Sequence, residues 1–195
     1  MRSVEPGSGW LRRVRRVVSP NHDPRPAGVC PELIVVHGIS LPPGRFGGPW
    51  IDRLFTNTLP PAADPYFATL QALRVSAHLL IGRDGRLTQY VPFEARAWHA
   101  GRSSWGGREE CNDFSIGIEL EGTDDRPYTA RQYRALARVI AALQRCYPLL
   151  ASGGIAGHRD IAPGRRSDPG PAFDWRRLER ELRRAGARFH PGLPA

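Results

Sequence analysis

The sequence predicts an α/β fold, a single domain with a central mixed β-sheet flanked by α-helices. Three observations predict it. Runs with strand patterning alternate with segments of helical spacing along the chain. One short run is continuously apolar, as in a strand buried on both faces. An Asp-Gly turn between two other strand-like runs indicates a hairpin, which makes the sheet mixed.

The first predicted core strand is Leu-Ile-Val-Val-His at residues 33–37. Its β-branched, uninterrupted apolar run is typical of a strand in the middle of a sheet. His37 stands at the end of this strand. The Pro- and Gly-rich residues 38–48 follow as a loop, and Pro49 and Pro65 each begin a short helix.

Two more strands are predicted at residues 75–81 and 86–91, joined by a turn at Asp84-Gly85. Residues 114–122 form a further strand, because apolar and polar side chains alternate along it. One face of that strand carries Ile116, Ile118 and Leu120, and the other carries Ser115, Gly117, Glu119 and Glu121.

The last third of the chain predicts two helices. Thr129 caps the first, which carries an apolar stripe and ends before Pro148, and Asp174 caps the second, which runs to Gly186. We expect residues 1–195 to form one domain, with 1–18 as a peripheral arm and 187–195 as a flexible tail.

The formal charge is +9, and all 28 basic residues are arginines. These arginines are scattered rather than gathered beside stacking aromatic residues, which argues against nucleic acid as a partner. The excess charge fits equally well with a small anionic substrate that is attracted electrostatically.

The apolar runs are strand-sized, so no membrane association is expected. Arg12-Arg13 and Arg15-Arg16 are not followed by the apolar segment of an export signal, which predicts a cytoplasmic protein, and a monomer is expected. The three cysteines are far apart and odd in number, so they are expected to be reduced thiols.

Three histidines lie in settings that favour metal binding: His37 at a strand end, His99 in Ala-Trp-His-Ala-Gly, and His158 in Gly-His-Arg-Asp. A hydrolytic zinc ion needs three protein ligands and an open fourth position. His158 and the following Asp168, together with His37, supply such a set, and prolines around Asp168 stiffen its backbone. The alternative is that Asp168-Pro169-Gly170-Pro171 is only a turn.

Glu119 is the predicted acid–base residue. Its neighbours on the strand face, Ser115 and Gly117, are small, so its carboxylate is expected to face a cavity. Partial burial would raise its pKa toward the working pH of a general base. Two alternatives remain open: a structural carboxylate paired with an arginine, and Glu121 in the same role.

Several long segments carry a resemblance to a known family. The chain resembles the zinc-dependent N-acetylmuramoyl-L-alanine amidases from about residue 19 to 175, and within them the cytoplasmic enzymes of cell-wall recycling that act on 1,6-anhydromuropeptides. The segments are Ser-Pro-Asn-His-Asp (19–23), Ile-Val-Val-His-Gly-Ile-Ser-Leu-Pro-Pro-Gly (34–44), Arg-Ala-Trp-His-Ala-Gly (96–101), Cys-Asn-Asp-Phe-Ser-Ile-Gly-Ile-Glu-Leu-Glu-Gly-Thr-Asp (111–124) and Ser-Asp-Pro-Gly-Pro-Ala-Phe-Asp-Trp (167–175).

The resemblance implies an amidase or peptidoglycan-recognition-like fold with one Zn²⁺ per chain, held by His37, His158 and Asp168. It implies that Glu119 is the catalytic carboxylate and that an anhydromuropeptide is the substrate. The bond cleaved would join the lactyl group of 1,6-anhydro-N-acetylmuramic acid to L-alanine of the stem peptide.

The chain departs from the family pattern at two positions near the metal. Arg166 stands where the pattern has lysine, so the residue can stabilise an oxyanion but cannot donate a proton at neutral pH. Gly38 stands where the pattern has asparagine, which puts a hydrogen bond near the site in question.

Four further residues are predicted to bind substrate, each with a structural alternative. Arg74 would clamp the carboxylates of the stem peptide, or form a surface salt bridge. Tyr66 would line the site, or pack in the core, and Trp98 and His99 would shape the cleft, or serve a structural role. The alternative function is a catalytically weak or inactive muropeptide-binding module of the same fold.

Overall fold

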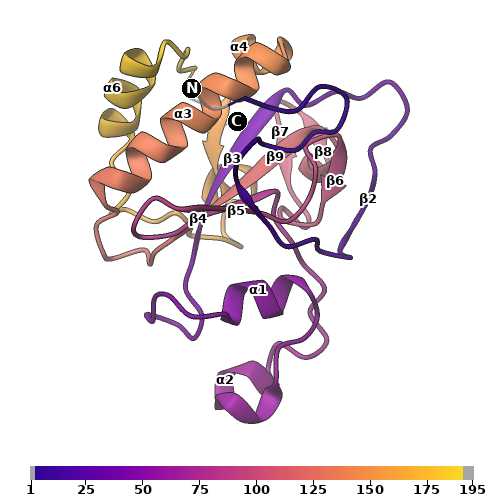
Figure 1. Cartoon of the computed structure of the whole chain (residues 1–195), viewed down its shortest axis with the longest axis vertical. Coiled ribbons are helices and arrows are strands. Elements are labelled where there is room, and N and C mark those ends of the chain that lie inside the picture. The colour runs from indigo at the N-terminus through magenta and orange to yellow at the C-terminus, as the bar shows by residue number, and fades with distance from the viewer. Residues whose placement is uncertain (1–2, 191–195) are drawn as a thin grey trace.

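The computed structural model describes residues 3–190, which form a single domain built on a six-stranded mixed sheet (Figure 1). Its strand order is β1 (Arg15–Arg16), β5 (Leu87–Gln89), β4 (Leu79–Ile81), β9 (Ser115–Glu121), β3 (Leu33–Ile39) and β10 (Ile155–Gly157). Strands β4, β9, β3 and β10 are parallel, and β5 is antiparallel to β4. The α/β fold with a mixed sheet is therefore confirmed.

The predicted hairpin is present and accounts for the antiparallel pair. β4 and β5 flank a turn in which Gly85 has a φ of 81°, a left-handed conformation that glycine adopts without strain. The two strands are shorter than the sequence predicts, because several of their outer residues bond to other segments. Ser76 donates its N–H to the Trp98 carbonyl, and the Tyr90 carbonyl accepts the N–H of Ser19. One hydrogen bond between the outer residues remains, from the Tyr90 N–H to the His78 carbonyl.

Two helices cover one face of the sheet. α3 (Ala130–Cys146) begins at Thr129, whose side chain forms a reciprocal capping box with Gln132, and α6 (Trp175–Ala185) begins at Asp174. They lie side by side (Figure 1) and pack apolar side chains against β3, β4 and β9. The short helices α4 (Leu149–Ser152) and α5 (His158–Ile161) flank β10 in sequence.

The loop predicted after β3 opens into a separate lobe. It contains α1 (Trp50–Phe55), a short 3-10 turn (Pro61–Ala63) and α2 (Pro65–Ala68), which lie apart from α3 and α6 (Figure 1). A second apolar cluster, which includes Leu41, Phe55, Phe67 and Tyr90, holds this lobe against the body of the protein.

Smaller elements complete the described chain. Two two-stranded sheets pair β2 (His22–Pro24) with β6 (Ala95–Ala97) and β7 (Ser104–Trp105) with β8 (Arg108–Glu109), and a 3-10 turn at Cys111–Asp113 precedes β9. Within residues 3–190, the three cysteines are free thiols, and no helix has the length and apolar character needed to span a membrane.

The N-terminal residues correct one expectation, since they are part of the fold rather than a peripheral arm. Leu11 is completely buried in the main core, and its N–H donates to the side chain of Gln89. Arg15 and Arg16 form the edge strand β1. Val4 and Val14 pack partly buried against the same core.

The C-terminal end differs in a similar way from the flexible tail that was predicted. Ala187 and Phe189 pack partly buried against the core, and Ile155 donates its N–H to the His190 carbonyl. Residues 191–195 of the predicted tail lie outside the described residues.

Candidate metal centre and active site

The ends of three neighbouring parallel strands bring the candidate residues together. β3 and β9 pair in a register that places His37 opposite Glu119. β10 pairs with the other edge of β3 and ends at Gly157, so His158 follows directly at the start of α5. Asp168 arrives from the loop after α5. The carboxyl edge of a parallel sheet is the usual place for a site in this fold class.

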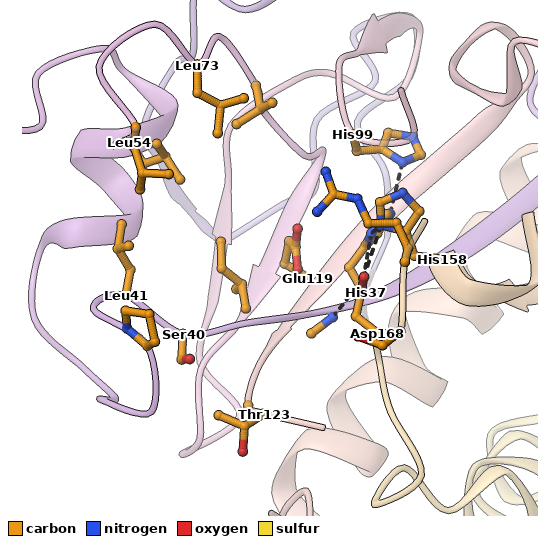
Figure 2. A pocket seen from close by; sticks show the side chains of 18 of the residues that line it. His37, Ser40, Leu41, Leu54, Leu73, His99, Glu119, Thr123, His158 and Asp168 are labelled. Carbon is orange, nitrogen blue, oxygen red and sulfur yellow. Dashed lines mark hydrogen bonds and ion pairs between the residues drawn. The ribbon is translucent and has the colours of Figure 1, made fainter. Parts of the chain in front are cut away.

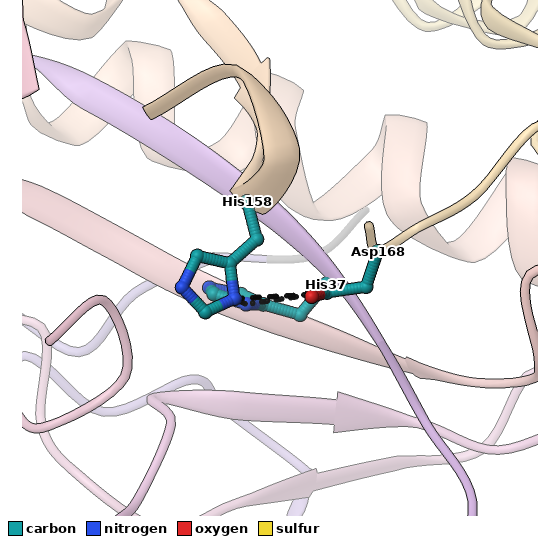
Figure 3. Close-up of side chains that lie close together, drawn as sticks. All are labelled: His37, His158 and Asp168. Atoms are coloured by element: carbon teal, nitrogen blue, oxygen red, sulfur yellow. Dashed lines mark hydrogen bonds and ion pairs between the residues drawn. The ribbon is translucent and has the colours of Figure 1, made fainter. Parts of the chain in front are cut away.

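Three side-chain atoms converge at this edge. His37 Nδ1 lies 3.0 Å from His158 Nδ1, and each of these nitrogens lies 3.2 Å from Asp168 Oδ2 (Figure 3). With ligand bonds of about 2.0–2.1 Å, a tetrahedral zinc ion separates its ligand atoms by about 3.3 Å, so the spacing is close to that of a metal site. Within residues 3–190, these three residues are the only such group of potential metal ligands.

Both imidazoles are enclosed by protein. His37 and His158 are 1% and 4% exposed. Burial, followed by the nearby His158 ring, lowers the pKa of His37 to about 4, which keeps this ring neutral at physiological pH. A neutral imidazole is the form that binds a metal ion.

A cavity of about 500 Å³ opens beside the three donor atoms. Figure 2 shows the two sides of this cavity, with His37, His158 and Asp168 on one side and Leu41, Leu54 and Leu73 of the α1–α2 lobe on the other. The cavity therefore has a polar, metal-binding wall and an apolar wall, which suits a ligand with both kinds of surface.

Glu119 lines this cavity and lies between its two walls (Figure 2). Its Oε2 atom is buried and has no hydrogen-bond partner within the described part of the chain. Burial raises the pKa of Glu119 well above its ordinary value, Asp168 raises it further, and Arg166 lowers it. An unpartnered carboxylate of this kind is free to exchange a proton with a bound molecule.

The neighbouring candidate, Glu121, is held away from this cavity. Its carboxylate accepts hydrogen bonds from the backbone N–H groups of Gly47 and Arg83. It joins the loop after β3 to the β4–β5 turn. Among the two glutamates of β9, the structure therefore favours Glu119 for the acid–base role.

Arg166 is exposed at the rim of the cavity. Its charge lowers the pKa of Glu119 and of His37, so the guanidinium acts electrostatically on both. Among residues 3–190, no ion pair is found for it, in contrast to Arg165, which donates to the carbonyls of Ala100 and Arg102.

Two of the four residues predicted to bind substrate line the cavity, and two do not. Tyr66 lines the cavity and is 41% exposed, while the adjacent Phe67 enters the core. His99 also lines the cavity and is buried. Arg74 and Trp98 are absent from the lining: Arg74 donates to the carbonyls of Gln71 and Leu73, and Trp98 donates its indole N–H to Asp23.

Tyr128 is a residue at this site that the sequence analysis missed. A Cβ atom at Gly38 would clash with the Tyr128 hydroxyl, and one at Gly122 would clash with its ring. The ring thus fills the space beside the glycine that departs from the family pattern. Its hydroxyl donates to the Pro169 carbonyl at 3.1 Å, next to Asp168. Only the unexplained glycine at position 38 could have pointed to it.

The chain is similar in sequence to known proteins. A family profile described as N-acetylmuramoyl-L-alanine amidase matches residues 27–171. The 1,6-anhydro-N-acetylmuramyl-L-alanine amidase AmpD of Escherichia coli is 63% identical over 170 residues, which cover 87% of this chain and 92% of that protein.

Two solved structures extend the comparison. A crystal structure of a selenomethionine AmpD derivative superposes with a TM-score of 0.88 at 59% identity, over 92% of this chain and 98% of that one. AmpDh3 of Pseudomonas aeruginosa, crystallised in complex with an anhydromuramic pentapeptide, gives a TM-score of 0.56 at 30% identity, over 77% of this chain and 59% of that one.

Proposed function

The chain belongs to the N-acetylmuramoyl-L-alanine amidase family, and from this we propose that it cleaves 1,6-anhydro-N-acetylmuramyl peptides during peptidoglycan recycling. The bond hydrolysed is the amide between the lactyl group of the sugar and L-alanine of the stem peptide. One observation carries the proposal: three convergent metal donors and the unpartnered carboxylate of Glu119 face one cavity. The cytoplasmic localisation expected from the sequence belongs to the same proposal.

The donor set fits a zinc ion. His158 Nε2 lies 3.1 Å from the Ala100 carbonyl, which can only accept, so this nitrogen carries the ring proton. The Nδ1 lone pair of His158 therefore faces the Asp168 carboxylate at 3.2 Å. Two electron-rich atoms at this distance repel each other unless a proton or a metal ion lies between them, and nitrogen and oxygen donors of this kind suit Zn²⁺.

When bound by His37, His158 and Asp168, zinc supplies a Lewis acid that polarises the scissile carbonyl and makes water a better nucleophile at neutral pH. The chain's own residues handle the proton and the charge. The Glu119 carboxylate takes the proton of the attacking water and then passes it to the alanine nitrogen as the amide bond breaks. A raised pKa suits this carboxyl group, because the proton must be released again.

The cavity positions the rest of the substrate. Its apolar wall, with Leu41, Leu54 and Leu73, offers contact area for the non-polar faces of the ligand. Tyr66 and Arg166 stand at exposed positions on the lining, where they can contact a bound molecule. The AmpDh3 complex with an anhydromuramic pentapeptide supports a ligand of this class.

Mass spectrometry of anhydro-N-acetylmuramyl-tripeptide incubated with the zinc-loaded protein tests the proposal. We expect free tripeptide and anhydro sugar, no products after a chelator has removed the metal, and recovery when zinc is restored. A protein that binds one zinc ion and the muropeptide but releases no products would overturn the enzyme assignment and establish a binding module.

Arg166 is expected to stabilise the negative charge that develops on the carbonyl oxygen. Loss of one such group costs about 10²-fold in kcat, so Arg166→Ala should lower kcat by about that factor, while Arg166→Lys should retain most of it because the charge remains. Arg86→Ala is the matched control, since Arg86 is exposed and paired with Asp84 away from the lining residues. Equal kcat values for Arg166→Ala and Arg86→Ala would contradict this role.

A further inference from the structure

His99 lies directly behind one of the candidate metal ligands. Its Nδ1 is 2.9 Å from His37 Nε2, on the side of His37 that faces away from Asp168 (Figure 2). The His99 ring is buried against β9, where a Cβ atom at position 117 would clash with it. Gly117 therefore provides the space in which this ring sits.

A serine beneath His99 sets the direction of the hydrogen bonds. Ser115 Oγ lies 2.5 Å from the Cys111 carbonyl and 3.1 Å from His99 Nε2. The carbonyl can only accept, so the single hydroxyl proton of Ser115 points to it. Ser115 Oγ must then accept from His99, which places the proton of this ring on Nε2.

The same reasoning continues to the metal ligand. With its proton on Nε2, the neutral His99 ring presents a lone pair at Nδ1, which accepts the N–H of His37 Nε2. His37 then has its own lone pair at Nδ1, the atom that faces His158 and Asp168. Three groups in a row, the Cys111 carbonyl, Ser115 and His99, thus determine which nitrogen of His37 is able to bind a metal ion.

The second imidazole ligand depends on the residue next to His99. His158 Nε2 donates to the carbonyl of Ala100, and the side chain of Asn112 accepts the backbone N–H groups of both His99 and Ala100, at 3.1 and 2.8 Å. One short segment, held by one amide side chain, therefore supports both candidate histidine ligands from behind.

We propose that His99 is a positioning residue for the metal site, and that Ser115 fixes its tautomer, so that the relay Cys111–Ser115–His99–His37 holds the His37 Nδ1 lone pair toward the metal. This assigns His99 a role behind the metal ligand, in addition to its place on the cavity lining, and it rests on the proposed zinc site. Replacing a residue that is hydrogen-bonded to a metal ligand typically lowers metal affinity by about 10- to 100-fold.

Two variants separate the relay from simple packing. His99→Phe keeps a buried ring but removes both hydrogen bonds, and Ser115→Ala removes only one oxygen atom while His99 stays. His190→Ala is the matched control, because His190 is exposed and only its backbone carbonyl is used. Ser115→Ala also covers the case in which His99→Phe fails to fold.

The first measurement is the tautomer of each histidine in the metal-free full-length protein, read from long-range proton–nitrogen NMR correlations on ¹⁵N-histidine. We expect the proton on Nε2 in both His99 and His37. In Ser115→Ala, His37 should become a mixture of tautomers. A His99 ring with its proton on Nδ1, or a His37 tautomer unaffected by Ser115→Ala, would overturn the proposal.

The second measurement is zinc affinity by competition with a chelator of known affinity. The dissociation constant should rise about 10- to 100-fold in His99→Phe and about 10-fold in Ser115→Ala, and remain unchanged in His190→Ala. The melting temperatures of the metal-free proteins show whether a loss of folding is responsible. Unchanged zinc affinity in His99→Phe would refute the relay. A wild-type protein that binds no zinc would instead refute the proposed function, and the NMR measurement would then decide whether Ser115 and His99 set the tautomer of His37.

Discussion

Replacing His158 with alanine is expected to eliminate both stoichiometric zinc binding and amide hydrolysis. Only His37 and Asp168 would remain as donors, and two ligands do not form a hydrolytic zinc site. The loss of zinc affinity should be larger than the roughly 10- to 100-fold loss that follows when a ligand loses its outer hydrogen-bond partner. Zinc content after dialysis, measured by atomic emission, and product formation, measured by mass spectrometry, give the two readouts.

His22→Ala is the matched control for His158→Ala. His22 lies in β2, which pairs with β6 outside the central sheet, so its loss leaves the three donor atoms in place. We expect one zinc ion per chain and wild-type turnover in this control. A His158→Ala protein that is folded, keeps one zinc ion and still hydrolyses the substrate would show that the three donors are not the metal site.

Replacing Glu119 with glutamine is expected to lower kcat by about 10²- to 10⁴-fold, which is the contribution of a general base. Zinc binding should persist, because Glu119 is not among the three convergent donors. Folding should also persist, since an amide in place of a buried carboxyl without a hydrogen-bond partner loses no contact of Oε2. Steady-state kinetics with the anhydromuropeptide and zinc content would be measured together.

Glu121→Gln is the control from the same strand. Glu121 binds the backbone of Gly47 and Arg83, so its replacement should lower thermal stability while kcat stays within a few-fold of the wild-type value. If Glu121→Gln lost as much activity as Glu119→Gln, or if Glu119→Gln remained fully active, the assignment of the proton-transfer role to Glu119 would be wrong.

Local signals in the sequence were enough for the central elements. The apolar run at 33–37, the Asp-Gly hairpin turn and the cap at Thr129 each depend on neighbouring residues, and all three features are present. Leu11 had no such signal. Leu11 is completely buried, and its backbone N–H bonds to the side chain of Gln89, a contact between distant parts of the chain.

The site shows the same division. His37, His158 and Asp168 could be selected by residue type, but their convergence depends on the register of β3 against β9 and β10. The direction in which a side chain points is even harder to predict from the sequence. Arg74 turns to backbone carbonyls, and the position of His99 requires the space over Gly117, which no pattern in the sequence describes.

The tyrosine wedged between two glycines links positions that are far apart in sequence. Because the Tyr128 hydroxyl occupies the space where a side chain at position 38 would begin, a larger residue at 38 requires Tyr128 to move or to be replaced. Either change removes the hydrogen bond from the Tyr128 hydroxyl to the Pro169 carbonyl, so the loop that follows Asp168 would have to be held in another way. A larger residue placed at position 38 alone would therefore crowd Tyr128. Changing residues 38 and 128 together would show what each position contributes.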